Sequence, residues 1–253
     1  MTMRSSVACI LAATMAFSLS VPSAAAQSTD TVSAAAPYGP PMEGMDVYTH
    51  VILNQLEGRF GAAGSSFRWS GEAWTGTDMN RLWLKSEGEV TDDRLEDGQQ
   101  EIFYDRPIST YFDLQAGLRS DIDAAPGRTW AAFGIQGLMP YFFEVSATAY
   151  ASSNGHYAAK LEGSYELLLT QRLILQPQVE ANFYSKADPP RDLGSGLSDI
   201  DAGLRLRYEF SRKFAPYIGV TYAGKFGGTA DIARAAGEHT DDVRFTVGVR
   251  AWL

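Results

Sequence analysis

Two methionines and a histidine near the beginning of the chain have side chains that bind soft metal ions. They are Met42, Met45 and His50, all within nine residues. Thioethers select Cu(I), and imidazole serves copper in either oxidation state. We therefore take this trio as a candidate site for a copper ion, Cu(I) or Cu(II). Because such a trio also arises by chance, the surrounding sequence decides how it is interpreted.

The other candidate ligands and nucleophiles are isolated. His156 and His239 fall in predicted loops without a partner at ligand spacing, and Met79 and Met139 fall in predicted short turns. A serine hydrolase would need a serine beside a histidine with an orienting group behind it. Here Ser152, Ser153, Asn154 and His156 share one loop instead. We expect no enzymatic activity.

The segment that carries the two methionines is predicted to be a flexible arm. Residues 27–45 are rich in Ala, Ser, Thr, Pro and Gly, and Pro37, Pro40 and Pro41 disfavour regular structure. Before it, residues 1–26 have the pattern of a signal peptide: Arg4, an apolar run, and three alanines at 24–26. The single cysteine, Cys9, lies in that run. The exported chain is therefore predicted to contain no disulfide and no thiolate site.

Strict alternation of polar and apolar residues characterises the rest of the chain, 46–253. In 199–210 the even-numbered positions are apolar, whereas the odd-numbered ones include Asp199, Asp201, Arg205, Arg207 and Glu209. Such a strand suits lipid on one face and a wet interior on the other. No apolar run beyond the signal peptide is long enough for a transmembrane helix. The fold class is therefore predicted as all-β, a transmembrane antiparallel up-and-down β-barrel in the outer membrane of a Gram-negative cell.

Counting the alternating segments predicts about twelve strands. The first, 47–59, also reads as a short amphipathic helix, so ten strands is the alternative. Longer connections, expected to be outer loops, are predicted around 91–98, 120–128, 152–156, 186–198 and 227–241; the shorter ones would face the periplasm, as the arm would. Aromatic residues near strand ends are predicted to form interfacial girdles: Trp69, Trp130, Tyr141, Phe142, Phe214, Tyr217 and Trp252. The predicted strands are 47–59, 67–76, 81–90, 99–106, 111–119, 129–137, 142–151, 157–169, 173–185, 199–210, 215–226 and 242–253.

The net charge of the chain excludes one class of binding partner. Without Arg4 the chain has 20 basic and 30 acidic residues, a net charge of −10. Nucleic acid is therefore excluded as a partner, because that affinity depends on neutralising phosphates. Charges of both signs are predicted to face the lumen, where they either pair and plug it or line an ion path; pairing is favoured. This inward set is Glu72, Arg81, Lys85, Glu87, Glu89, Glu101, Asp105, Asp113, Arg119, Glu144, Lys160, Glu162, Glu166, Glu180, Asp201, Arg205, Arg207 and Arg250.

Six segments resemble the copper resistance protein B family of Gram-negative outer membranes. They are 80–90 (NRLWLKSEGEV), 113–120 (DLQAGLRS), 128–145 (RTWAAFGIQGLMPYFFEV), 167–177 (LLLTQRLILQP), 194–209 (GSGLSDIDAGLRLRYE) and 225–238 (KFGGTADIARAAGE). The resemblance implies a copper-handling outer-membrane protein that contributes to copper resistance and homeostasis. It implies outer-membrane lipid, copper ions and a periplasmic multicopper oxidase as partners. The Met- and His-rich arm typical of the family is reduced here to Met42, Met45 and His50, and the chain has Leu253 where an aromatic residue is usual.

Two functions from other classes remain open. A passive porin or structural barrel would show no metal-dependent phenotype. An outer-membrane lipid hydrolase is less favoured, because no predicted strand presents a serine beside a histidine.

Overall fold

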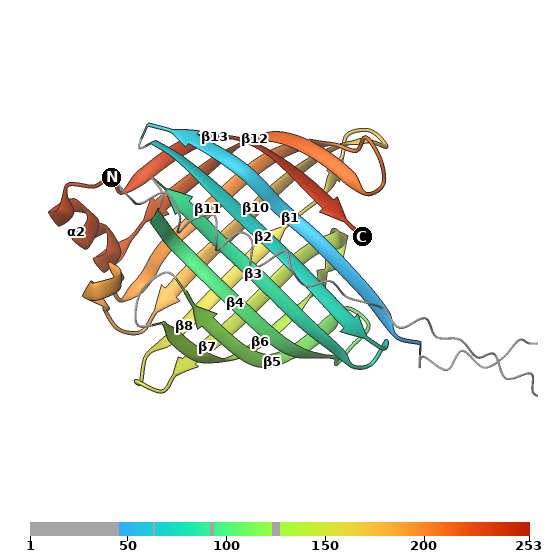
Figure 1. Cartoon of the computed structure of the whole chain (residues 1–253), viewed down its shortest axis with the longest axis horizontal. Helices are drawn as coiled ribbons and strands as arrows, with labels where there is room; N and C mark the ends of the chain where they lie inside the picture. Colours follow the sequence, from blue (N-terminus) through green and yellow to red (C-terminus); the bar gives the residue numbers. More distant parts are fainter. Residues whose placement is uncertain (1–45, 63, 92–93, 123–126) are drawn as a thin grey trace, which may run out of the picture. The chain divides into compact units, whose positions relative to one another are not determined.

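The computed structural model describes residues 46–62, 64–91, 94–122 and 127–253. The described chain forms one antiparallel sheet in which the first and last long strands also pair, so the sheet closes into a barrel (Figure 1). Twelve strands make the wall, and the two-residue strand β9 pairs only with β10 among the described residues. The predicted count of twelve is confirmed, and the first segment is a strand. The proposed arm and signal peptide lie outside the described residues.

The strands follow one another around the barrel in chain order. They are β1 (Tyr48–Gly61), β2 (Gly64–Gly76), β3 (Arg81–Thr91), β4 (Arg94–Pro107), β5 (Phe112–Asp121), β6 (Arg128–Met139), β7 (Phe143–Ser152), β8 (Tyr157–Ser164), β9 (Leu167–Leu168), β10 (Leu173–Tyr184), β11 (Gly196–Tyr208), β12 (Phe214–Lys225) and β13 (Asp241–Trp252). Within the described residues, three short helices lie in connections: η2 (Pro140–Phe142), η3 (Pro189–Arg191) and α2 (Gly227–Ala236). No helix in the described part of the chain is long and apolar enough to cross a membrane, a finding that does not bear on crossing by strands.

Alternation produces the two faces of the wall. In β13, Phe245 and Val247 are about half exposed on the outside, whereas Thr246 between them is fully buried. In β11, Leu204 is likewise half exposed, and its neighbour Arg205 is buried. Successive side chains of a strand point to opposite faces. The outer face is therefore apolar and the inner face polar, as predicted for these strands.

A β-bulge in β1 interrupts this alternation. The register against β2 shifts between Leu53 and Gln55, and the register against β13 shifts between Leu53 and Leu56. Ile52 lines the lumen before the shift, whereas Glu57 and Arg59 are fully buried in it after the shift. One inserted residue moves the inward face from even to odd positions. The sequence pattern of this strand was ambiguous for that reason.

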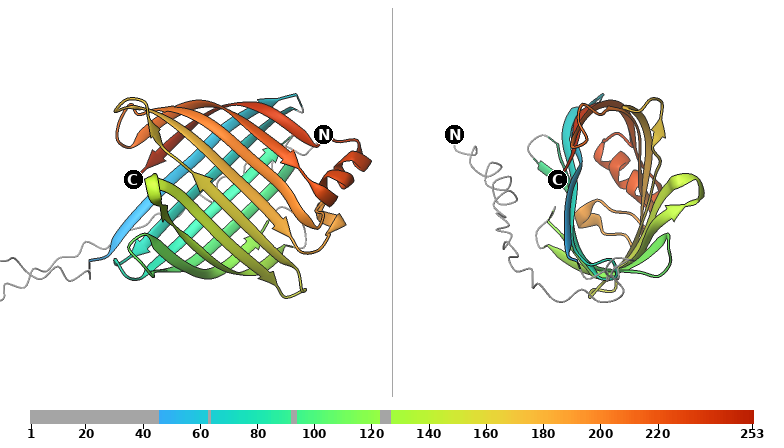
Figure 2. Two further views of the ribbon diagram at one scale, coloured as in Figure 1. Left: turned by 180° about the vertical axis from the view of Figure 1, so that it is seen from behind. Right: turned by 90° about the vertical axis from the view of Figure 1, so that its right-hand side faces the viewer.

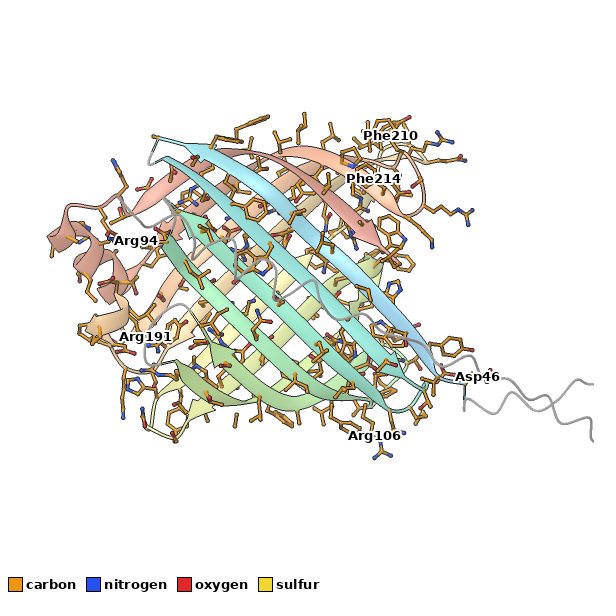
Figure 3. All side chains as sticks on the ribbon, in the orientation of Figure 1. Asp46, Arg94, Arg106, Arg191, Phe210 and Phe214 are labelled. Carbon is orange, nitrogen blue, oxygen red and sulfur yellow. The ribbon has the colours of Figure 1, made fainter. Side chains whose placement is uncertain are left out.

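The two ends of the barrel differ. β1 begins and β13 ends at one end, which we call the open end; Asp46, Arg106 and Phe210 lie there (Figure 3). α2 and η3 lie at the other, which we call the capped end (Figure 1). A view into the open end shows α2 inside the outline of the wall (Figure 2). Thr229 links α2 to β11 and to the loop before β11. Its Oγ1 accepts from Gly194 N at 2.8 Å and lies 2.9 Å from Ser198 Oγ.

Two predictions about connections and girdles are corrected. Most of the predicted loop 91–98 is strand, because β4 begins at Arg94 and the strands pair as far as Thr91 with Arg94. Residues 152–156 form only a tight turn, in which Ser152 N donates to His156 O. Trp130 and Tyr217 are not girdle residues, since both are buried. Aromatic residues close to strand ends face either side, and their type alone did not reveal which.

Candidate functional site

A network of ion pairs fills part of the lumen, and Glu57 on β1 lies at its centre. The Glu57 carboxylate accepts four hydrogen bonds: Arg59 Nε at 2.8 Å, Arg205 Nε and Nη2 at 2.9 Å each, and Tyr217 Oη at 2.9 Å. Glu57 and Arg59 are completely buried, and Arg205 nearly so. Buried charges are tolerated only when they are paired and hydrogen-bonded. These contacts join strands at opposite ends of the sequence into one rigid unit.

The network continues to neighbouring strands through Arg59. Its Nη1 donates to Asp201 at 2.7 Å and to Glu89 at 3.1 Å. Glu89 also accepts from Arg244 at 2.6 Å, and Arg68 donates to Glu180 at 2.9 Å. The charges therefore pair across the lumen, as the sequence had favoured over an ion path.

Three carboxylates of the network lie close enough to hold a cation, and a lysine lies among them. Oxygen atoms of Glu87, Glu162 and Glu180 fall within 4.8 Å of one another. Lys160 Nζ contacts these three side chains at 2.7, 3.2 and 3.6 Å. The ammonium group of Lys160 therefore lies where a cation would otherwise bind among the three carboxylates. Carboxylate oxygens are also hard ligands, poorly matched to Cu(I).

Aromatic side chains fill the adjoining part of the lumen. Trp83, Phe103, Trp130 and Tyr150 pack together with Ala132, and Trp74 packs against them. Cationic groups lie over several of these rings, including Arg119 over Tyr150 at 4.8 Å from the ring centre. This cluster and the ion pairs stabilise the wall from the inside.

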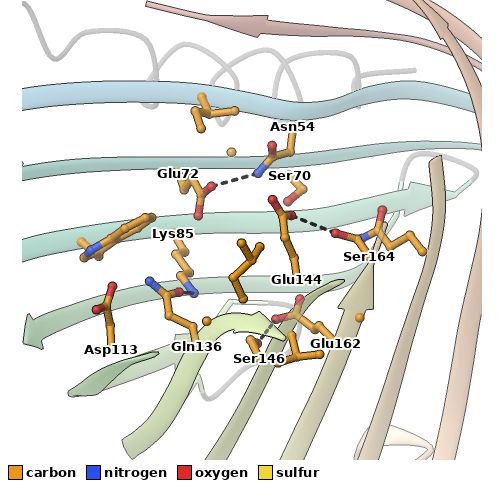
Figure 4. Close-up of a pocket in the computed structure, with 18 of the residues that line it drawn as sticks. Asn54, Ser70, Glu72, Lys85, Asp113, Gln136, Glu144, Ser146, Glu162 and Ser164 are labelled. Carbon is orange, nitrogen blue, oxygen red and sulfur yellow. Dashed lines mark hydrogen bonds between the residues drawn. The ribbon is translucent and has the colours of Figure 1, made fainter. Parts of the chain in front are cut away.

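A cavity of about 900 Å³ occupies the lumen toward the open end. Figure 4 shows part of its lining, with Glu72, Lys85, Asp113, Glu144 and Glu162 among the labelled residues. The lining contains six carboxylate side chains and four cationic ones. The carboxylates are Glu72, Asp78, Glu87, Asp113, Glu144 and Glu162, and the cations are Arg81, Lys85, Arg205 and Arg250.

Glu166 ties the β8–β10 connection to the wall at this end. Its Oε1 accepts from Arg207 at 2.9 Å and from Arg250 at 2.6 Å. Burial opposes ionisation of this carboxyl, but the two guanidinium groups outweigh it and lower the pKa of Glu166 below its usual 4.5. Glu166 is therefore ionised at neutral pH.

Of the predicted copper ligands, only His50 belongs to the described residues. Met42 and Met45 lie outside them, so the trio remains a prediction. His50 is half-buried near the start of β1 at the open end, opposite Trp74 in register, with the two ring centres 6.0 Å apart. In the described ranges its imidazole forms no hydrogen bond or ion pair. The structure does not bring His50 together with another described histidine, because His156 and His239 lie in capped-end connections between β7 and β8 and between β12 and β13.

The inward set was mostly identified from the sequence, but its central members were missed. Arg205, Lys160, Glu180 and Glu89 are buried in the lumen as predicted. Glu57, Arg59 and Arg68 were not in the predicted set. A run of charged residues at 57 and 59 beside apolar Phe60 was the available signal, and the bulge in β1 obscured it.

The serines and histidine of the β7–β8 turn show no catalytic arrangement. The contacts among them within the described residues are backbone hydrogen bonds of the turn, Ser152 N to His156 O and Gly155 N to Ser152 O. The expectation that the chain is not an enzyme stays a prediction.

A closed antiparallel barrel with an apolar outer wall and a charged, mostly paired interior defines an outer-membrane type of β-barrel. The NanC porin structure has the same fold: it aligns with a TM-score of 0.54 over 79% of this chain and 98% of that chain, at 10% identity. At that identity the likeness concerns the fold alone.

Sequence comparison then identifies the family. Residues 47–253 match the family model described as Copper resistance protein B precursor. Copper resistance protein B of Escherichia coli is 46% identical over 203 residues, which cover 80% of this chain and 69% of that protein. The Copper resistance protein B homolog of Pseudomonas syringae pv. tomato is 43% identical over 207 residues, covering 82% and 70%. The chain belongs to the copper resistance protein B family, and the resemblance seen in the sequence is confirmed.

Proposed function

We propose that this protein lies in the outer membrane, where it binds and handles copper on the periplasmic side and so contributes to copper resistance and homeostasis. The observation that carries the proposal, given the family, is the position of His50. It lies near the start of β1, at the open end, and its imidazole forms no hydrogen bond or ion pair among the described residues. In the sequence Met42 and Met45 precede His50 by eight and five residues, so the three candidate ligands lie within nine residues of the chain.

The orientation rests on the lengths of the connections. At the open end the wall strands are joined by short turns such as 77–80, 108–111 and 209–213, whereas the capped end holds the long connections 185–195 and 226–240. Bacterial outer-membrane barrels have short periplasmic turns and longer outer loops. The open end and the arm then face the periplasm. A periplasmic multicopper oxidase is the partner that would meet them there.

The lumen is proposed to be blocked rather than open. Glu57, Arg59, Thr221 and Thr246 are fully buried inside the barrel, and α2 lies over the capped end. Charges that pair across a lumen leave little room for water, so a passive porin would require this network to separate. The cavity at the open end would hold the ion or its complex without a continuous path to the outside.

Copper titration tests the binding step. The refolded wild-type protein and the triple variant Met42→Ala, Met45→Ala, His50→Ala are titrated with Cu(I) against a competing chelator. We expect the triple variant to lose the tightest site, because it lacks both thioethers and the imidazole. His156→Ala is the matched control, a histidine at the capped end. A triple variant with unchanged affinity and stoichiometry would show that the arm does not bind copper.

A second experiment tests the physiological role. Cells with and without this protein are compared for growth in copper and for periplasmic copper content. Equal tolerance and equal copper content would contradict a role in copper resistance. Single-channel recording in a planar bilayer tests the blocked lumen, since a passive porin gives steady conductance steps and the proposed structure gives none.

A further inference from the structure

Four exposed cationic side chains at the open end have no acidic partner in the described part of the chain. Arg106 lies near the end of β4, and Arg172 lies in the turn between β9 and β10. Arg212 and Lys213 lie in the turn between β11 and β12. None of these side chains forms a hydrogen bond or an ion pair with another described residue. Most cations of the lumen, in contrast, pair with carboxylates.

Three of these cations are brought together because their two turns are hydrogen-bonded to each other. The backbone N–H of Glu209 donates to the carbonyl oxygen of Arg172 at 2.8 Å. Arg212 and Lys213 follow Glu209 in the chain. The Glu209 carboxylate lies 3.7 Å from the buried Arg207, so its own ion pair is with the lumen. We call Arg172, Arg212 and Lys213 the rim cluster.

The side chains that lead to the rim cluster along the outside of β11 change in type toward the open end. Leu204 and Tyr208 are exposed on the outer face, and Phe210 is exposed just beyond the end of the strand. The rings of Tyr208 and Phe210 meet edge to face, with their centres 5.0 Å apart. Arg212 follows in the turn. The order is therefore aliphatic, then aromatic, then basic.

Two other strands have the same order of exposed side chains. Toward the open end it is Val220, Ile218, Phe214 and Lys213 along β12, and Ile102, Tyr104 and Arg106 along β4. Figure 3 shows Arg106, Phe210 and Phe214 at this end of the barrel. One leaflet of a bilayer has the matching order: hydrocarbon, then the interface that aromatic rings prefer, then charged headgroups.

From this arrangement we infer that the rim cluster binds the headgroup phosphate of an anionic phospholipid such as phosphatidylglycerol. Guanidinium and ammonium groups donate charge-assisted hydrogen bonds to phosphate oxygens. Phe210 and Phe214 flank Arg212 and Lys213 in the chain and lie beside the apolar part of the lipid. A zwitterionic phospholipid is disfavoured, because its own ammonium group is repelled by three cations.

The outer face also favours a lipid over an acidic protein as the ligand. The cations continue columns of exposed apolar side chains on the wall, and they do not line the cavity of the lumen. The inference rests on the membrane location in the proposed function, and the periplasmic leaflet follows from the proposed orientation. It does not depend on copper.

The test is native mass spectrometry of the full protein in a neutral detergent, with a metal chelator present throughout. Phosphatidylglycerol and phosphatidylcholine with identical acyl chains are added in turn. Phosphatidylglycerol should bind at least about tenfold more tightly, since each cation near an anionic surface contributes about fivefold. Added salt should reduce the difference. Equal affinities would overturn the inference and leave an acidic protein as the ligand. Because copper is removed, this result is separate from the copper titration.

Protein variants locate the site. A variant without the rim cluster should lose the preference for phosphatidylglycerol and still bind phosphatidylcholine: Arg172→Gln, Arg212→Gln, Lys213→Gln. The matched control makes the same change of charge at three exposed cations of the capped end: Arg94→Gln, Lys186→Gln, Arg234→Gln. Heat-modifiable gel migration checks that each variant is folded. An equal loss of preference in both variants would overturn the inference, because lipid would then respond to net charge alone. If the rim variant failed to fold, the comparison of the two lipids on the wild type would still decide.

Discussion

Removing the Glu57 carboxylate, with Glu57→Leu, is the most informative single change to the barrel interior. Glu57 is completely buried and accepts both nitrogen donors from Arg205 and one from Arg59. Arg59 retains Asp201 at 2.7 Å and Glu89 at 3.1 Å, whereas the one hydrogen-bond acceptor that Arg205 retains among the described residues is the amide oxygen of Gln178 at 3.1 Å. The variant therefore leaves one guanidinium group, that of Arg205, buried without a carboxylate.

The expected loss of unfolding free energy follows from the unpaired guanidinium group of Arg205. Breaking a buried ion pair by removing one partner destabilises by about 3 to 5 kcal/mol. Replacing both partners by apolar residues of similar size is often close to neutral. The double variant Glu57→Leu, Arg205→Met should therefore be more stable than Glu57→Leu alone. Exposed ion pairs are worth about 1 kcal/mol or less, so Glu238→Leu, which breaks the exposed pair with Lys225, is the control.

The assay is equilibrium unfolding by urea or guanidinium chloride in lipid vesicles, followed by tryptophan fluorescence and gel mobility. The free energies of unfolding of the wild type, both single variants, the double variant and the control complete the cycle. A double variant less stable than Glu57→Leu by the full cost of Arg205→Met would refute the reasoning, because the two side chains would then act independently.

Three further changes test other parts of the structure. Leu204→Arg places a charge on the lipid face and should destabilise by about 2 to 4 kcal/mol near the bilayer midplane, whereas Ser164→Arg, in the lining of the cavity, should change the unfolding free energy little; equal effects would mean that the faces are wrongly assigned. Glu166→Gln should lower stability at neutral pH and converge with the wild type as the pH falls well below 4.5: the folded-state pKa of Glu166 is lowered by Arg207 and Arg250, so its contribution is present above the unfolded pKa and lost as the pH falls through the folded one. Parallel curves of unfolding midpoint against pH would contradict this. Tyr141 and Phe142 have φ of 68° and 64° and are 86% and 77% exposed, so Tyr141→Asn with Phe142→Gly should stabilise the isolated barrel in detergent by about 1 kcal/mol or more; a loss of stability would show that the two aromatic rings make contacts worth more than the strain.

Much of the wall was predictable because its pattern is local. In 199–210 and 242–253 the period of two is unbroken, and it correctly assigned Arg205 to the lumen and Val247 to the outside. A local pattern cannot show which charges meet, because Arg59 and Asp201 are 142 positions apart and come together only through closure of the barrel. α2 was also missed: residues 227–241 were interpreted as a loop, since a ten-residue segment beginning Gly-Gly has weak helical propensity alone.

The predicted copper site shows the same limit in another form. The side-chain type identified His50 as a candidate copper ligand, and the structure places it at the open end of the lumen. Spacing along the chain could not show that Trp74 would lie opposite it, because that neighbour is set by strand register. The sequence also could not show that Lys85 lies opposite Glu72 in strand register, although both residues had been assigned to the interior.

The seam between β1 and β13 has a consequence for how the chain assembles. Ile52 lies opposite Trp252, so the first strand obtains its second neighbour only when the last strand is present. Contacts so distant in sequence form slowly, and until then β1 is an edge strand able to pair with another chain. The bulge at Leu53–Leu56 interrupts that edge. It therefore serves assembly as well as the finished barrel, since an irregular edge is a poor template for aggregation before the barrel closes.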